Sequence, residues 1–152
     1  MTHPPVLFRR ATAADWPQWA ALRRQLWPDC GVDPAELREL LDGPDSVVFL
    51  AVDPGGEVLG LAEASLRHDY VNGTAGSPVG FLEGWYVQPA ARRRGVGGGL
   101  VADVARWARG RGCRQLASDT AQDDAAAQSA HAACGFSETE RVVYYCMDLE
   151  AP

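Results

Sequence analysis

The stretch RRRGVGGGL, from Arg92 to Leu100, constrains the fold of this chain more than any other feature. Three consecutive arginines repel one another, and each glycine costs about 0.5–1 kcal/mol in a helix or strand interior relative to alanine. The stretch follows an apolar run at 79–87 that predicts a strand, and it precedes a helical pattern at 100–112. Residues that oppose regular structure between a strand and a helix predict a functional turn.

The turn has the composition of an anion-binding site. The first N–H groups of a helix lack intrahelical acceptors, and the helix dipole adds partial positive charge there. Glycine lets an anion approach the backbone closely, and arginine supplies charge-assisted donors. The spacing Arg92-x-x-Gly95-x-Gly97 therefore predicts a pyrophosphate cradle. An exposed basic turn without function is the simpler alternative.

A dinucleotide-binding motif is a second interpretation of the same glycines. Gly97-x-Gly99-x-x-Ala102 has the required spacing, and Asp119 follows about 20 residues later, where an acid would bind the ribose. We do not favour it, because a chain of 152 residues is short for a doubly wound sheet with a substrate region. The arginine triplet is also not part of that motif.

Composition excludes several classes of function. All 14 basic residues are arginines, so no lysine can bind a phosphate, form a Schiff base or act as a catalytic amine. A net charge of −6 argues against nucleic acid and favours cationic partners. No apolar run approaches the roughly 20 residues of a membrane span, and the four cysteines lack metal-ligand spacing. We therefore expect a cytoplasmic protein without a metal.

The periodicity predicts one domain, residues 1–152, with an α/β (α+β) fold. Asp15, with Gln18 three residues later, is expected to cap the first helix, and Asp33-Pro34 to begin the second. A short strand is expected from Leu7, before the first helix. Further strands are expected at 46–52, 57–66, 79–87, 114–119 and 140–149, and further helices at 100–112 and 123–134. This order predicts a central mixed, mostly antiparallel sheet flanked by helices on both sides.

With these elements placed, the chain resembles the GNAT superfamily of acetyl-CoA-dependent N-acetyltransferases. The turn matches the superfamily motif R/Q-x-x-G-x-G/A. The resemblance narrows to the aminoglycoside 6'-N-acetyltransferases through RRQLWP, RHDYVNG, SPVGFLEGWYV, RRRGV, ASDT and GFSETERVVYY, which span nearly the whole chain. It implies the GNAT fold, acetyl-CoA as the donor, a polycationic aminosugar as the acceptor, aminoglycoside resistance and a homodimer.

The resemblance also implies the residues of two binding sites. The coenzyme A site comprises Trp85, Tyr86, Val87, Arg92, Arg93, Arg94, Gly95, Val96, Gly97 and Gly98, with Asp124 nearby. The acceptor site comprises Trp27, Tyr70, Glu83, Asp119 and Glu140. Carboxylates suit a sugar that carries several ammonium groups, and aromatic rings cover its apolar faces and attract cations.

Glu83 is the strongest candidate for catalysis. Strand alternation places it on the face of Phe81 and Trp85, where an unpaired carboxylate is costly. Either Gly84 marks a bulge that redirects it, or a cation pairs with it. We expect direct transfer of the acetyl group, with Glu83 accepting the proton of the amine directly or through water, and with the N–H of Val87 facing the thioester oxygen.

The general acid, which would protonate the departing thiolate of coenzyme A, is less well defined. Many members of the superfamily have a tyrosine four residues before the GF pair, where this chain has His131. His131 is a candidate, a helix histidine without catalytic function is the alternative, and Tyr144 or Tyr145 are others. Cys134 has no base beside it in sequence, so a covalent acetyl-enzyme is not expected.

Two further functions remain open on the sequence. One is acetylation of another polyamine or of a protein N-terminus, with aminoglycosides as incidental substrates. The other is a non-catalytic acetyl-CoA sensor, which the set of acceptor-site acids argues against.

Overall fold

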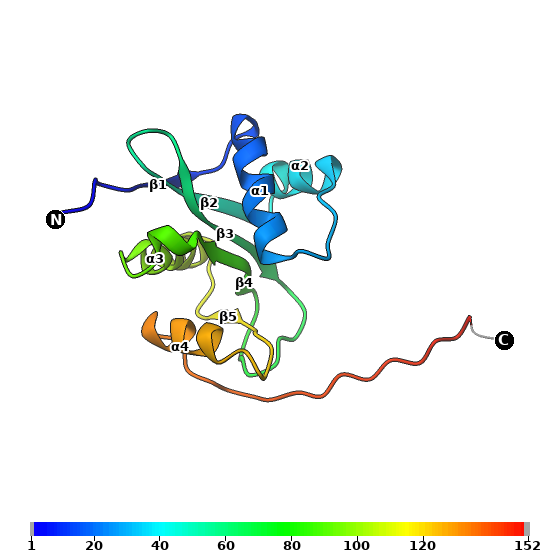
Figure 1. Cartoon of the computed structure of the whole chain (residues 1–152). Helices are drawn as coiled ribbons and strands as arrows, with labels where there is room; N and C mark the ends of the chain where they lie inside the picture. Colours follow the sequence, from blue (N-terminus) through cyan, green and yellow to red (C-terminus); the bar gives the residue numbers. More distant parts are fainter. Residues whose placement is uncertain (1, 151–152) are drawn as a thin grey trace. The chain divides into compact units, whose positions relative to one another are not determined.

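The computed structural model describes residues 2–150, in two units that meet in sequence between Asp119 and Thr120. The first unit contains a five-stranded sheet in the order β1-β2-β3-β4-β5 (Figure 1). The strands are β1 (Leu7–Arg10), β2 (Ser46–Val52), β3 (Val58–Arg67), β4 (Val79–Val87) and β5 (Leu116–Ser118). The first four pair antiparallel, and only β5 runs parallel to β4. The predicted mixed, mostly antiparallel sheet is confirmed.

Helices cover both faces of this sheet, as predicted. On one face α1 (Trp16–Leu26) and α2 (Pro34–Asp42) lie beside each other, and α3 (Val96–Gly110) lies on the opposite face (Figure 1). Fully buried Trp19 and Leu37 pack against Leu50 and Leu61 on the first face. Two short 3₁₀ turns, η1 (Ala13–Asp15) and η2 (Pro89–Ala91), precede α1 and α3.

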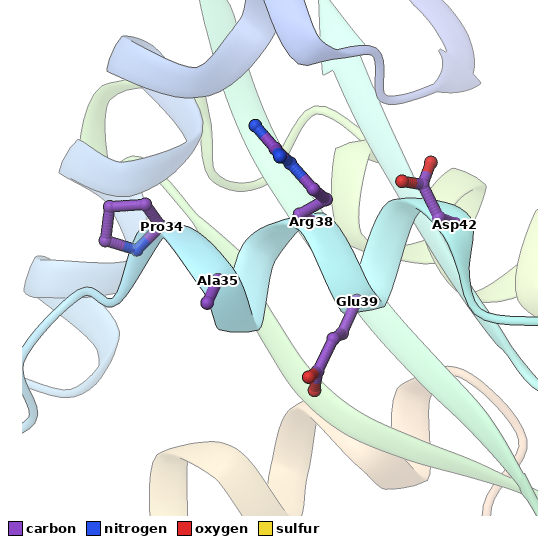
Figure 2. A pocket seen from close by; sticks show the side chains of 5 residues that line it. All are labelled: Pro34, Ala35, Arg38, Glu39 and Asp42. Atoms are coloured by element: carbon purple, nitrogen blue, oxygen red, sulfur yellow. The ribbon is translucent and has the colours of Figure 1, made fainter.

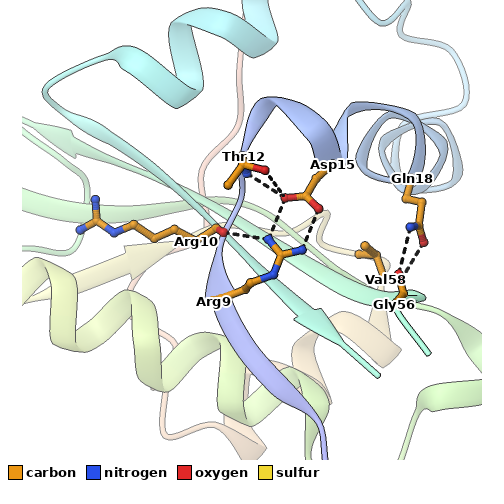
Figure 3. A network of polar contacts seen from close by, with 7 residues as sticks. All are labelled: Arg9, Arg10, Thr12, Asp15, Gln18, Gly56 and Val58. Atoms are coloured by element: carbon orange, nitrogen blue, oxygen red, sulfur yellow. Dashed lines mark hydrogen bonds and ion pairs between the residues drawn. The ribbon is translucent and has the colours of Figure 1, made fainter. Parts of the chain in front are cut away.

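The N-terminus of α1 differs from the prediction, because Asp15 does not cap the helix with its side chain. Its carboxylate instead accepts two hydrogen bonds from the guanidinium of Arg9, at 2.7 and 2.8 Å, and one from the N–H of Thr12 (Figure 3). Gln18, the expected second member of the cap, bridges to the backbone of Gly56 and Val58. A bidentate arginine is a stronger partner for a carboxylate than a backbone N–H, which explains the difference.

Helix α3 begins four residues earlier than the sequence predicts, inside the glycine run. Gly97 and Gly99 have a packing role there, because an added Cβ would lie 3.0 Å from the ring of Trp85 and 2.2 Å from that of Phe8. The cost of glycine in a helix is therefore offset by close contact with two aromatic rings. Asp33 caps α2 as predicted and accepts a 2.9 Å bond from the N–H of Ala35.

The second unit contains α4 (Ala125–Ala133), which is close to the predicted helix. The strand predicted at 140–149 is wrong, since no residue from 136 to 150 belongs to a helix or strand. Its β-branched and aromatic residues are instead solvent-exposed, with Val143 at 71% and Tyr145 at 93%. Such residues favour a strand only where a neighbouring strand completes the ladder, and the described part of the chain supplies none to them.

Within residues 2–150, none of the helices has both the length and the apolar character needed to cross a membrane. The expectation of a single domain over 1–152 stays a prediction.

The Arg9–Asp15 pair gives a prediction about stability and pH. Hydrogen bonds from Arg9 hold the pKa of Asp15 below its usual value, although burial acts in the opposite direction. The stabilisation is therefore complete at neutral pH and is lost as the pH falls through the folded-state pKa. We expect Asp15→Asn to lower the free energy of unfolding by about 1–2 kcal/mol at neutral pH, since Arg9 is one-third exposed.

Urea unfolding of this variant and of the original chain, at several pH values, measures the effect. The gap between them should shrink below about pH 4, the ordinary range of an aspartate. Asp29→Asn, at an exposed aspartate, is the control. A gap for Asp15→Asn that does not change with pH would contradict the assignment.

Candidate active site

The edge of β4 is open where the predicted donor site lies. Strand β5 pairs only with Gly80, Phe81 and Leu82, whereas β4 continues to Val87. From Glu83 onward, no described strand lies on that side of β4. A strand edge that no neighbouring strand covers can offer N–H and C=O groups to a peptide-like ligand that adds as a further strand. The predicted residues Trp85 to Val87 lie on the section of β4 that no described strand covers on this side.

The turn at 92–98 has the backbone of an anion-binding site. Arg93 and Gly95 adopt left-handed φ values of 61° and 76°, and such turns gather successive N–H groups on one side. The first backbone hydrogen bond of α3 runs from Gly99 to the carbonyl of Gly95, so the N–H groups of residues 96–98 precede the helical ladder. Apart from its chain neighbours and the nearby backbone of its own helix, no described atom lies within 4 Å of where a Cβ of Gly98 would be, which leaves room for a ligand there.

The three arginines of the turn differ in what they contact. Arg92 donates a 2.9 Å hydrogen bond from Nε to the carbonyl of Val87, and its guanidinium lies 5.5 Å from the ring centroid of Tyr86. It therefore ties the turn to the end of β4. The Nε of Arg94 is buried and has no hydrogen-bond partner among the described residues. A buried donor without an acceptor is costly, so Arg94 fits a site that an anionic ligand completes.

Glu83 lies at a β-bulge beside this open edge. Glu63 pairs with Gly84 and the next residue, Ala64, pairs with Leu82, which leaves Glu83 as the extra residue of β4. A bulge redirects a side chain, and this one leaves the Glu83 carboxylate one-third exposed. The sequence offered a bulge or a cation as alternatives, and the structure contains both.

The cation is Arg67, at the end of β3. Its Nη2 lies 2.9 and 2.8 Å from the two carboxylate oxygens of Glu83, and its Nε lies 3.1 Å from Oε1. Ser65 adds a 2.5 Å hydrogen bond to Oε1. The guanidinium also stacks on Phe81, 3.4 Å from the ring centroid. Arg67 is part of the RHDYVNG segment, but the sequence did not reveal its pairing with Glu83.

Trp27 packs directly against the bulge. An added Cβ on Gly84 would lie 2.5 Å from Cη2 of the Trp27 ring, so only glycine allows this contact. The guanidinium of Arg23 lies 5.1 Å from the centroid of the same ring, within the range of a cation–π interaction. Of the predicted acceptor-site residues, the structure thus places Trp27 beside the strand residue that follows Glu83.

A buried ion pair supports this arrangement and was not foreseen. Glu63 is 2% exposed and accepts a 2.8 Å hydrogen bond from the indole N–H of Trp19, while Nε of Arg23 lies 2.9 Å from the same oxygen, without hydrogen-bond geometry. Burial raises the pKa of Glu63, and the charge of Arg23 opposes that rise. Removing either partner would leave a buried charge, which is strongly destabilising. An acid inside the apolar run LGLAEASL was the available signal.

Tyr70 and Asp119 complete the predicted acceptor residues of the first unit. Tyr70 is 76% exposed in the loop after β3. Asp119 is exposed and directly follows β5, whose last residue, Ser118, pairs with Leu82. Asp119 and Glu83 therefore each follow one member of the last residue pair between β5 and β4.

The remaining predicted residues belong to the second unit. Asp124 caps α4 by accepting a 3.0 Å bond from the N–H of Ala127. His131 has its Nδ1 2.7 Å from the carbonyl of Ala127, and its ring lies edge-on to Phe136 with centroids 5.2 Å apart. Glu140 is exposed. These contacts give Asp124 and His131 structural roles within their own unit, and their catalytic or binding roles stay predictions.

Surface hollows do not change this assignment. Figure 2 shows a hollow whose lining comes from α2 alone, formed by Pro34, Ala35, Arg38, Glu39 and Asp42. None of the predicted site residues lines it. A second hollow includes Arg23, Trp27 and Glu36, and it therefore adjoins the bulge. Between residues 2 and 150, no group of three or more His, Cys, Asp or Glu side chains is arranged to hold a metal ion.

Known proteins are similar to this chain in both sequence and fold. The model of the acetyltransferase (GNAT) family matches residues 10–136. The chain is 56% identical over 142 residues to aminoglycoside N(6')-acetyltransferase type 1 of Stenotrophomonas maltophilia. The matched region covers 93% of this chain and 93% of that protein. The structure of AAC(6')-Iy in complex with the bisubstrate analogue CoA-S-monomethyl-acetylneamine is 42% identical, with a TM-score of 0.90 over 95% of this chain and 99% of that one.

A further solved structure agrees. Aminoglycoside 6'-N-acetyltransferase AAC(6')-Ih from Acinetobacter baumannii has a TM-score of 0.91 at 40% identity, over 95% of this chain and 99% of its own. The chain therefore belongs to the GNAT acetyltransferase family and, within it, to the aminoglycoside N(6')-acetyltransferases of type 1.

Proposed function

We propose that this protein transfers the acetyl group of acetyl-CoA to the 6'-amine of aminoglycosides, and so confers resistance to them. The observation that carries the proposal is the arrangement along the section of β4 that no described strand covers. The anion-binding turn at 92–98 follows its end at Val87, and Glu83, with the ring of Trp27 beside it, lies at its start. A donor that is anionic at one end and an acceptor that carries ammonium groups match these two ends in charge. The bisubstrate analogue bound to AAC(6')-Iy, which joins CoA to an aminosugar, supports the same pairing.

The residues of the turn and the strand edge fit coenzyme A. The N–H groups of residues 96–98 and the unpaired Nε of Arg94 would receive the pyrophosphate, and the backbone from Trp85 to Val87 would pair with the pantetheine arm. The N–H of Val87 would stabilise the negative charge that develops on the thioester oxygen. The donor supplies the acetyl group, and the protein contributes orientation of the two substrates.

Glu83 would hold the acceptor amine and take its proton. A C–N bond forms as the neutral amine attacks the thioester carbonyl, and the C–S bond breaks to release the thiolate of coenzyme A. Before the attack, the acceptor ammonium loses one proton to the carboxylate of Glu83, directly or through water, which makes the amine neutral. A second N–H proton leaves the nitrogen as the amide forms, and the thiolate takes up one proton from water and leaves as the thiol. Trp27 would cover an apolar face of the sugar beside this carboxylate.

Transfer without an acetyl-enzyme agrees with the cysteines. Burial raises the pKa of both Cys113 and Cys134, which disfavours the thiolate that a covalent route needs. All four cysteines are free. Free thiols and consumption of acetyl-CoA both suit a cytoplasmic enzyme.

The substrate assignment predicts which acceptors are acetylated. Radiolabelled acetyl-CoA should transfer its acetyl group to kanamycin or tobramycin, and analogues with a hydroxyl in place of the 6'-amine should stay unlabelled, because the bond forms at that nitrogen. The alternative, a polyamine or a protein N-terminus as the true acceptor, predicts faster labelling of spermidine or of N-terminal peptides. Absence of transfer to every amine would indicate a non-catalytic sensor.

The contact between Trp27 and Gly84 predicts the effect of one methyl group. Gly84→Ala places a Cβ 2.5 Å from the Trp27 ring, so the ring or the strand must move. We expect KM for the aminoglycoside to rise and KM for acetyl-CoA to stay unchanged, with stability lower by about 1–3 kcal/mol. Steady-state kinetics and urea unfolding measure both.

Gly110→Ala, at a helical glycine with nothing within 4 Å of the added Cβ, is the matched control. Unchanged acceptor KM in Gly84→Ala would show that Trp27 does not contact the aminosugar.

We further propose that the protein is a homodimer and that a second copy covers residues 142–149. Six side chains of this segment are large, apolar and exposed, and Tyr144, Tyr145 and Leu149 exceed 80% exposure. A contiguous apolar row of this kind marks an interaction surface.

Sedimentation should show a dimer of the original chain and a monomer of the variant Val143→Asp/Tyr145→Asp. Gln122→Asp, at an exposed polar residue, should remain a dimer. A monomeric original chain would contradict the proposal.

A further inference from the structure

The Arg67–Glu83 pair at the bulge is more elaborate than an ordinary surface ion pair. Exposed ion pairs add little to stability, and these side chains are 42% and 33% exposed. Yet Arg67 donates hydrogen bonds to both carboxylate oxygens of Glu83, and its guanidinium stacks on the ring of Phe81, a residue that is only 5% exposed. A guanidinium that is fixed by stacking on a buried ring also fixes the position of the carboxylate to which it donates two hydrogen bonds.

The hydrogen bonds are distributed unequally between the two oxygens of Glu83. Oε1 accepts from Ser65 Oγ at 2.5 Å, and from Nε and Nη2 of Arg67 at 3.1 and 2.9 Å. Oε2 accepts only from Nη2, at 2.8 Å. A carboxylate has about four lone-pair sites, two on each oxygen. Oε1 is therefore saturated, and Oε2 retains capacity for one more hydrogen bond.

From this geometry we infer that Arg67 is a positioning residue for acetyl transfer. It holds Glu83 so that Oε2, and not Oε1, receives the acceptor ammonium and its proton. The inference rests on the proposed role of Glu83. Arg67 itself does not need to touch the substrate, and it acts through the carboxylate.

The pairing also excludes a free rotation of Glu83 that the exposed bulge would otherwise allow. A base misplaced by about 1 Å can lose a factor of roughly 100 in rate. Ser65 fixes one oxygen from β3 and Arg67 fixes the plane of the carboxylate, so both determinants come from the strand that pairs with the bulge. Arg67 is thus expected to affect the chemical step more than the binding of either substrate.

A double-mutant cycle tests this inference. Arg67→Ala should lower kcat about 10- to 100-fold and leave KM for acetyl-CoA unchanged. Because Arg67 acts through Glu83, the double variant Arg67→Ala/Glu83→Gln should be no slower than Glu83→Gln alone. Arg67→Lys should recover only part of the rate, since an ammonium cannot form the bidentate fork. Added guanidinium ion should partly restore Arg67→Ala.

The control is Arg106→Ala, which removes a surface arginine paired with Asp103 on α3 and should leave kcat unchanged. Additive losses in the double variant would overturn the inference. So would an undiminished kcat in Arg67→Ala with a lower KM for the aminoglycoside, which would mean that Arg67 competes with the substrate for Glu83.

A crystal structure of Arg67→Ala provides a readout that does not depend on acetyl transfer. The Glu83 carboxylate should leave its present position or occupy several rotamers. If it stays in place on Ser65 alone, the positioning role is wrong even if the enzyme acetylates aminoglycosides. If the original chain acetylates no aminoglycoside but Glu83 moves in the variant, the proposed function fails, and with it the role of Arg67 in acetyl transfer, whereas the structural part of the inference, that Arg67 fixes the Glu83 carboxylate, stands.

Discussion

The loss of β5 as a partner after Leu82 is the constraint on which the candidate site depends. A strand inside a sheet has its N–H and C=O groups paired on both sides, so it cannot bind a peptide-like ligand through its backbone. Strand β4 is paired on both sides only from Gly80 to Leu82 and is held on one side by β3 as far as Val87. The result is a strand held by β3 on one side, with no described strand on the other side beyond Leu82. The bulge at Glu83 begins where β5 ends, so the position of the acid and the uncovered edge arise from one local feature.

Charge is arranged around this strand in pairs. Each of the two acids near the bulge has an arginine partner, Glu63 with Arg23 and Glu83 with Arg67. Both arginines also contact an aromatic ring, Trp27 for Arg23 and Phe81 for Arg67. A guanidinium is suited to this double role because it is planar and permanently charged. Each acid is therefore held by a guanidinium that is itself placed against a ring.

Much of the fold follows from local signals in the sequence. Periodicity predicted the strands at 46–52 and 57–66, Asp33-Pro34 predicted the start of α2, and the arginine–glycine stretch predicted a turn between a strand and a helix. These features depend on residues a few positions apart. The segment at 140–149 shows the limit of such signals, because a strand also needs a neighbour that sequence periodicity does not reveal.

The site could be predicted only where one residue carries the signal. Glu83 suggested a bulge at Gly84 or a cation because strand alternation places its carboxylate on the face of Phe81 and Trp85, where an unpaired charge is costly. Arg67 and Trp19 could not be assigned, since their partners lie 16 and 44 residues away and the pairing depends on strand register and helix packing. Asp15 was misassigned because a helix cap and an arginine compete for the same carboxylate, and only the folded chain brings Arg9 to it.

On this proposal, the section of β4 that no described strand covers and the turn after it bind one donor molecule. The most direct measurement is a titration of the ¹⁵N-labelled protein with coenzyme A, followed through the amide resonances. We expect the largest shifts at the N–H groups of residues 85–87 and 95–98, with one shared dissociation constant. Shifts confined to other parts of the chain, or different constants for the two segments, would contradict it.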